Sequence, residues 1–191
     1  MARVYLIALG GNVERGRRGI ADLLKEAISA LDRGAGRITR VSRFFRSPAF
    51  PPGSGPDYIN AALAMESDET PEQVLARLHE VEQAFGRERK KRWGARVLDL
   101  DLLGCGDEVR PSEAVWRQWR DLPLDRQMAE APEELILPHP RLQDRAFVLV
   151  PLAEVAPEWL HPVMRKSVMQ MCEDLSQDDR AALVPVEEAA G

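Results

Sequence analysis

The sequence predicts an α+β sandwich in which helices flank a largely antiparallel sheet. Two kinds of apolar segment alternate through the first 105 residues: short runs rich in β-branched and aromatic residues, and longer runs whose apolar residues recur at helical spacing. Their order is strand, helix, strand, strand, helix, strand. This is the order of a ferredoxin-like fold, with its helices on one face of the sheet.

The first half of that pattern is predicted as follows. A strand over residues 3–9 stops at the turn-forming sequence GGN. Apolar residues at helical spacing predict a helix over residues 20–31. A second strand is predicted over residues 37–46 and a third over residues 58–65. The third has almost no polar residue, which favours a central strand buried on both faces.

The second helix has well-defined ends. Thr70 is placed to act as the N-cap, Pro71 occupies the first helical position, and Gln73 is placed to complete a capping box. Gly86 suits a C-cap and ends the helix. The fourth strand follows over residues 97–103.

This fourth strand contains two acidic residues that are suited to bind a metal ion. Its residues alternate, so Asp99 and Asp101 project together from one face. Carboxylate oxygens suit Mg²⁺, which uses one or two carboxylates and completes its octahedron with water and substrate phosphates. Residues 87–96, just before the strand, carry six basic residues against one acid in a chain whose net charge is -5. Basic side chains beside a metal site indicate a phosphate-rich ligand.

Each half of this stretch also has a simpler interpretation. A run of charges is usually a solvated face, and alternating aspartates can be the polar edge of a sheet. Their direct adjacency favours the functional interpretation.

The same stretch contains a longer pattern, made of Arg92, Gly94, Ala95, Arg96, Asp99, Leu100, Asp101, Leu102 and Leu103. These nine positions resemble the signature of the hydroxymethyl-dihydropterin pyrophosphokinases of folate synthesis. The similarity extends from about residue 4 to residue 157. It implies an enzyme that transfers the pyrophosphoryl group of ATP to the hydroxymethyl oxygen of 6-hydroxymethyl-7,8-dihydropterin and releases AMP. The hydroxymethyl oxygen would attack the β-phosphorus in line.

The resemblance also implies roles on the nucleotide side. Asp99 and Asp101 would hold two Mg²⁺ ions, while Arg87 and Arg96 would be catalytic and bind the phosphates. The residues expected to bind ATP are Glu82, Arg89, Trp93, Leu102, His139 and Arg145. Leu102 would do so through its backbone. For Glu82, an exposed helical glutamate without a role is the simpler alternative.

A second group would bind the pterin: Ser47, Pro48, Phe50, Tyr58, Asn60 and Phe147. Tyr58 and Phe147 would stack on the flat ring, and Asn60 would offer a donor and an acceptor to its amide-like edge. Without the resemblance, the two aromatic residues would be taken as ordinary core residues.

The remainder of the chain is less regular. We expect residues 1–175 to form a single catalytic domain, with a last amphipathic helix over residues 163–175 and a frayed tail over residues 176–191. The chain between Asp101 and Pro138 is longer than in the compact form of the family. The extra segment, residues 111–132, is predicted to be a tryptophan-anchored surface helix beside the mouth of the nucleotide site.

Composition argues against several other classes of protein. Two cysteines make neither a disulfide framework nor a spaced metal set, and no run of residues is long and apolar enough for a membrane span. We expect a monomer in the cytoplasm that binds neither membrane nor nucleic acid. Two alternatives stay open: another two-metal phosphoryl or nucleotidyl transferase, which would not need the pterin residues, and a regulatory or RNA-binding module, although no RNP-like pattern is present.

Overall fold

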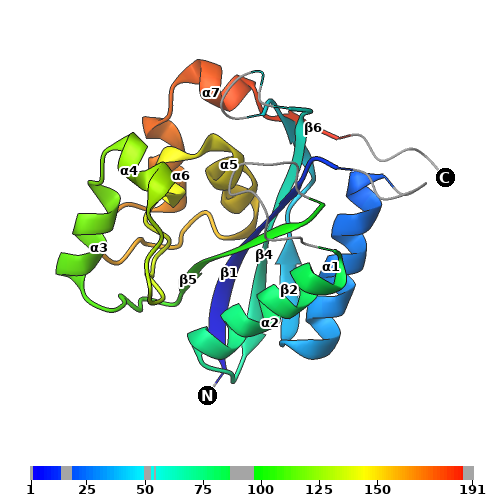
Figure 1. Cartoon of the computed structure of the whole chain (residues 1–191). Helices are drawn as coiled ribbons and strands as arrows, with labels where there is room; N and C mark the ends of the chain where they lie inside the picture. The colour runs from blue at the N-terminus through cyan, green and yellow to red at the C-terminus, as the bar shows by residue number, and fades with distance from the viewer. Residues whose placement is uncertain (1, 14–18, 50–52, 54, 87–96, 187–191) are drawn as a thin grey trace.

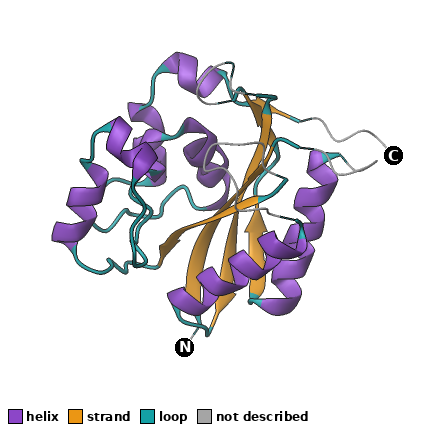
Figure 2. Ribbon diagram, in the orientation of Figure 1, coloured by secondary structure: helices purple, strands orange, loops and turns teal. Residues whose placement is uncertain are grey.

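The computed structural model describes residues 2–13, 19–49, 53, 55–86 and 97–186, and an antiparallel sheet with helices on both faces runs through them (Figures 1 and 2). The strands are β1 (Arg3–Gly11), β2 (Arg37–Val41), β3 (Phe45–Ser47), β4 (Tyr58–Ser67), β5 (Asp99–Cys105) and β6 (Val184–Pro185). They lie in the order β5-β1-β4-β3-β6, and β2 pairs with the edge of β4 that β3 also uses.

The helices fall into two layers. They are α1 (Ile20–Gly34), α2 (Pro71–Ala84), α3 (Glu113–Arg120), α4 (Leu124–Ala129), the short 3₁₀ helix η1 (Leu142–Asp144), α5 (Ala146–Val155), α6 (Val168–Asp174) and α7 (Gln177–Ala181). The helices α1 and α2 pack on one face of the sheet, as the ferredoxin-like order predicts. The capping box of α2 is confirmed, because Thr70 and Gln73 each hydrogen-bond the backbone of the other.

Alternate residues of β1 face two separate cores. Ile7 and Leu9 belong to the core beneath α1 and α2, whereas Leu6 and Ala8 belong to the core beneath α5 and α6. Strand β4 lies between β1 and the β2–β3 edge and is almost wholly buried, so the prediction of a central strand is confirmed.

The second helical layer differs from the prediction, which placed helices on one face only. Helix α5 is apolar nearly all round, and a helix buried in this way has no amphipathic period by which it could be found. The predicted strand over residues 37–46 is two strands, which separate at Ser42. The Ser42 hydroxyl there accepts a hydrogen bond from the Ala62 N–H over 2.9 Å. The last amphipathic helix is also shorter than expected, because only α6 is helical.

The C-terminal segment is a further correction. Residues 176–186 were expected to fray, but they form α7 and then β6, which pairs with β3. The N–H of Val186 donates to the carbonyl oxygen of Phe44 over 2.8 Å and extends this pairing. The segment lacks a long apolar period because it contributes only one strand at the edge of the sheet. Residues 187–191 lie outside the described part.

Residues 111–132 fold into α3 and α4 beyond the β5 edge of the sheet (Figure 1). Trp116 of α3 is fully buried in a small core with Ile136 and Val163. Its ring meets that of His161 edge to face, with 5.0 Å between the ring centroids. A tryptophan thus anchors this segment to the chain that follows it. Across the described ranges, no helix combines the length and apolarity needed to cross a membrane.

Buried His161 predicts a specific loss of stability in acid. Its Nδ1 accepts hydrogen bonds from the N–H groups of Val163 and Met164, and burial lowers its pKa to about 4. Above pH 6.5 the ring is neutral whether the chain is folded or unfolded, so its titration does not change the stability there. Between about pH 6.5 and 4 only the unfolded chain takes up the proton, and one such group costs up to about 1.4 kcal/mol per pH unit.

The variant His161→Asn tests this expectation. An asparagine oxygen can take the place of Nδ1 as an acceptor but does not titrate near neutral pH. Urea unfolding at several pH values should give a shallower fall in the free energy of unfolding for His161→Asn than for the wild type. Parallel curves for the two proteins would contradict the assignment.

Candidate active site

The two aspartates lie on the face of the sheet that α5 covers. Asp99 stands opposite Gly10 of β1, and Gly10 stands opposite Asn60 of β4. Residues directly opposite in an antiparallel sheet point to the same face. Two residues along, Asp101 stands opposite Ala8. Both carboxylates are partly exposed, and the residues beside them in β1 are small, which leaves room above the sheet.

Gly10 has a specific reason to be glycine. A Cβ at this position would lie 3.2 Å from Oδ1 of Asn60, so a side chain here would crowd the asparagine amide. On its other side, the Asn60 amide nitrogen donates to the Ser47 hydroxyl over 2.8 Å, and both residues are at least 95% buried. A buried polar pair of this kind holds the amide in one orientation.

Three of the other residues predicted to bind the pterin lie in the described part of the chain. Tyr58 stands opposite Ser47, is partly exposed and points to the same face as Asn60. Phe147 lies in α5 and packs against the core on this face. Pro48 follows Ser47 and is exposed. Phe50 lies outside the described residues. Four separate segments therefore bring polar and aromatic groups to one face of the sheet.

His139 stands at the outer edge of β5. Its backbone N–H donates to the carbonyl oxygen of Leu103 over 2.8 Å, and its ring Nδ1 accepts from the backbone N–H of Arg141 over 3.1 Å. Burial lowers its pKa to about 3, and the positive charges of Arg145 and Arg141 act in the same direction. The negative charge of Asp99 opposes them, which shows that the carboxylate is within electrostatic range.

A pKa near 3 keeps the imidazole neutral at physiological pH. Because Nδ1 is an acceptor, the hydrogen-bond pattern assigns the proton to Nε2. His139 thus offers one neutral donor, beside the two positive guanidinium groups of Arg141 and Arg145. Such a group can bind an anion without losing or gaining a proton.

Arginines surround this histidine. The guanidinium of Arg145 lies 5.6 Å from the ring centroid of Phe147, so the predicted nucleotide and pterin residues meet at the start of α5. Arg141 was missed by the sequence analysis, although it lies two residues after His139. Burial and the charge of Arg145 lower its pKa. The sequence PHPRLQDR, in which two arginines follow a histidine within six residues, was the available signal.

Glu82 requires a correction. It was expected to reach the ribose of ATP, but it is 1% exposed, and its carboxylate accepts a hydrogen bond from the N–H of Leu100 over 2.8 Å. Helix α2 packs on the face of the sheet opposite the aspartates, so the side chain points away from them. Its position one helical turn before the basic segment was misleading. Glu82 instead fixes the start of β5 to α2.

Leu102 points its side chain into the core under α1 and α2 and pairs with Ile7. The carbonyl oxygen that accepts from His139 at the outer edge belongs to Leu103. The expected contact between the Leu102 backbone and adenine stays a prediction. The remaining predicted residues, namely Arg87, Arg89, Trp93 and Arg96, lie outside the described part of the chain.

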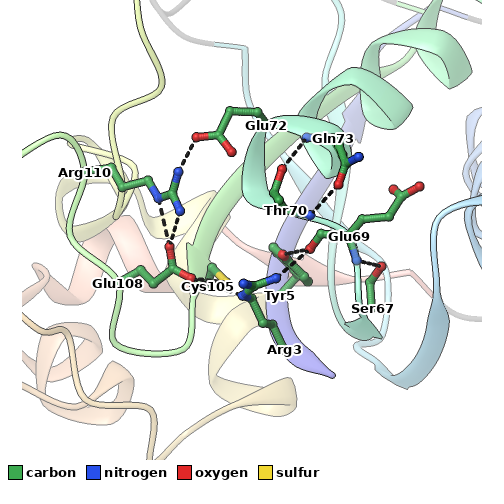
Figure 3. Close-up of polar contacts among 10 residues, drawn as sticks. All are labelled: Arg3, Tyr5, Ser67, Glu69, Thr70, Glu72, Gln73, Cys105, Glu108 and Arg110. Atoms are coloured by element: carbon green, nitrogen blue, oxygen red, sulfur yellow. Dashed lines mark hydrogen bonds and ion pairs between the residues drawn. The ribbon is translucent and has the colours of Figure 1, made fainter. Parts of the chain in front are cut away.

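A different set of polar contacts lies at the start of β1, at the opposite end from Gly10 (Figure 3). There the Tyr5 hydroxyl donates to the carbonyl oxygen of Glu69, and Arg110 bridges Glu108 and Glu72. The neighbouring thiol of Cys105 is buried, which raises its pKa to about 11. Polar groups at this end bind one another and burial keeps the thiol protonated, as expected for a structural network.

Comparisons with known proteins agree with the geometry. Residues 6–157 match the family described as 7,8-dihydro-6-hydroxymethylpterin-pyrophosphokinase. The enzyme named 2-amino-4-hydroxy-6-hydroxymethyldihydropteridine pyrophosphokinase in Synechocystis sp. is 39% identical over 95% of this chain and 79% of its own. The protein of the same name in Haemophilus influenzae is 33% identical over 82% of this chain and 83% of its own.

Solved structures are similar in fold. The wild-type Plasmodium falciparum protein titled HPPK-DHPS has a TM-score of 0.63 over 91% of this chain at 13% identity, and this chain spans 44% of its length. The predicted α+β ferredoxin-like fold is thereby confirmed. Because the family match covers most of the chain, the chain belongs to the 7,8-dihydro-6-hydroxymethylpterin-pyrophosphokinase family.

Proposed function

We propose that the face of the sheet bearing Asp99 and Asp101 is where this chain carries out the reaction of its family. The chain is an ATP-dependent pyrophosphokinase of folate biosynthesis, which transfers the pyrophosphoryl group of ATP to 6-hydroxymethyl-7,8-dihydropterin. AMP is the second product. The observation that supports this location is the row Asp99–Gly10–Asn60, which sets a carboxylate and a fixed amide on the same face of the sheet with only a glycine between them.

The carboxylates fit a magnesium site. Asp99 and Asp101 share one face and are both partly exposed, and no third histidine, cysteine or acid completes a metal cluster with them among the described residues. Two carboxylates are a sufficient protein contribution for Mg²⁺, whose other ligands are commonly water and substrate phosphates. When bound, two Mg²⁺ ions would neutralise charge on the triphosphate and lower the pKa of the attacking hydroxyl.

The chain's own residues then divide the binding of the substrates. The pterin would lie against Asn60 and between Tyr58 and Phe147, and its hydroxymethyl group would point toward the aspartates. The triphosphate would lie toward His139 and Arg145, so that the hydroxymethyl oxygen approaches the β-phosphorus in line. Among the residues outside the described part, we propose Arg87 and Arg96 for the phosphates, and Arg89 and Trp93 for closure over the substrates.

Asn60 provides a test of the pterin side. Its amide is held by Ser47 at one end and lies over Gly10 at the other. We expect Asn60→Ala to raise the KM for the pterin about 5- to 150-fold, because an unpaired polar edge costs about 1–3 kcal/mol. The KM for ATP should stay within about twofold. Steady-state kinetics with each substrate varied in turn would reveal an equal rise in both constants, which would contradict the assignment.

Product analysis tests the function itself. The protein is incubated with Mg²⁺, ATP and 6-hydroxymethyl-7,8-dihydropterin, and omission of each component is the control. AMP and pterin diphosphate should form in equal amounts only when all three are present. ADP would indicate γ-phosphoryl transfer by a related enzyme, and the absence of nucleotide turnover would favour a binding module. We also propose that the protein acts as a monomer in the cytoplasm, which light scattering and localisation would test.

A further inference from the structure

Helix α3 makes a contact next to His139. The indole N–H of Trp116 donates to the carbonyl oxygen of Pro138 over 2.7 Å, and both atoms are buried. Pro138 directly precedes His139, whose own N–H is bound to Leu103. The peptide unit before the histidine is thus held on one side by β5 and on the other by α3.

Helix α3 makes a second contact with the same segment. A guanidinium N–H of Arg141 donates to the carbonyl oxygen of Trp119 over 3.0 Å. Trp119 lies in the last turn of α3, where carbonyl groups lack helical partners and carry negative partial charge. Arg141 also donates its backbone N–H to Nδ1 of His139, so α3 holds one residue on each side of the histidine, Pro138 and Arg141.

Neither contact is needed to close the inserted segment. Arg110 and Leu137 exchange backbone hydrogen bonds of 2.8 and 3.1 Å, which bring the two ends of the segment together. A short turn between these residues would satisfy the same pairing. The contacts of α3 with Pro138 and Arg141 are therefore additional.

We propose that α3 is a positioning element for the triphosphate side of the active site, with Trp116 as the positioning residue. By holding Pro138 and Arg141, it fixes the direction of the His139 donor and of the Arg141 charge before ATP arrives. Groups that are ordered beforehand lose less entropy when they bind a ligand. The inference rests on the proposed function only in placing the triphosphate beside His139, and the role of Arg141 is part of the inference itself.

A matched pair of variants tests this inference. Trp116→Phe keeps an aromatic ring but removes the N–H donor. Trp159→Phe makes the same chemical change, because the Trp159 indole donates to the carbonyl oxygen of Gly106 over 2.8 Å, in the turn that directly follows β5. The two variants therefore lose the same type of hydrogen bond, and only one of these bonds adjoins the histidine.

The measurement is the dissociation constant of an ATP analogue with a methylene group between its α- and β-phosphates, determined by calorimetry with Mg²⁺. We expect Trp116→Phe to weaken binding about fivefold and Trp159→Phe to leave it unchanged, while the KM for the pterin stays constant in both. Arg141→Lys keeps Trp116 and the charge but removes the planar group that reaches Trp119, and it should also weaken binding severalfold. Equal constants for wild type and Trp116→Phe, or equal weakening by both tryptophan variants, would overturn the inference.

The proposed function can fail separately. A wild type that binds the analogue but forms no AMP would contradict the function, while a selective effect of Trp116→Phe would still support positioning. A wild type that makes AMP but shows no selective effect would overturn the positioning role alone. Failure of the wild type both to bind the analogue and to form AMP would overturn both.

Discussion

Replacement of Asp101 by asparagine should lower kcat by about 10³-fold or more while the fold is retained. The change removes one negative oxygen ligand, and the charge neutralisation supplied by a metal is worth several kcal/mol in the transition state, at 1.36 kcal/mol for each factor of ten. Asp101 is partly exposed and lies beside Ala8, so an amide of the same size has room. Asp99→Asn should have a similar effect.

The measurement is the rate of AMP formation at saturating ATP and pterin, together with a thermal melt of each variant. Asp107→Asn is a suitable control, because Asp107 is an exposed acid in the turn that follows β5. It should keep the wild-type rate. A rate within tenfold of the wild type for either Asp99→Asn or Asp101→Asn would remove that residue from the mechanism.

Replacement of Trp116 by alanine should lower the free energy of unfolding by about 3–5 kcal/mol, the usual cost of removing a large buried aromatic side chain. Trp116 is fully buried, touches His161 and satisfies the carbonyl of Pro138. The matched control is Trp119→Ala in the same helix, where the side chain is only partly buried and the loss should be smaller.

Urea unfolding of the two variants gives the comparison directly. If Trp116→Ala cost no more than Trp119→Ala, residues 111–132 would be a surface decoration that the rest of the domain does not need. A loss near the expected value would make α3 part of the folding unit of the domain.

Local patterns predicted the core of the fold well. The capping chemistry of Thr70 and the alternation around Asp99 depend on residues close together in sequence, and the structure contains both features. Helix α5 and strand β6 were harder to predict. The first is apolar all round, and the second depends on pairing with Phe45, which is far away in the chain. Long-range pairing leaves no local period.

Local patterns also placed some of the candidate site residues correctly and missed others. Asp99, Asn60 and Ser47 do lie on one face, because the register of three strands aligns them. Glu82 was misassigned because distance along the sequence does not show on which side of a sheet a helix lies. Arg141 was missed because its position depends on a hydrogen bond to Trp119, which lies 22 residues earlier in the chain.

The hydrogen bond between Glu82 and Leu100 also bears on how this family can diversify. It joins the end of α2 to the start of β5, so the two points between which residues 87–96 run are fixed by the domain itself. A doubling in the length of a loop between fixed ends costs only about 0.6 kcal/mol. Insertions, deletions or grafted sequences between Gly86 and Val97 should therefore be tolerated without displacing the aspartates. Changes in residues 87–96 could therefore alter the proposed closure over the substrates, while the proposed metal ligands in β5 stay in place.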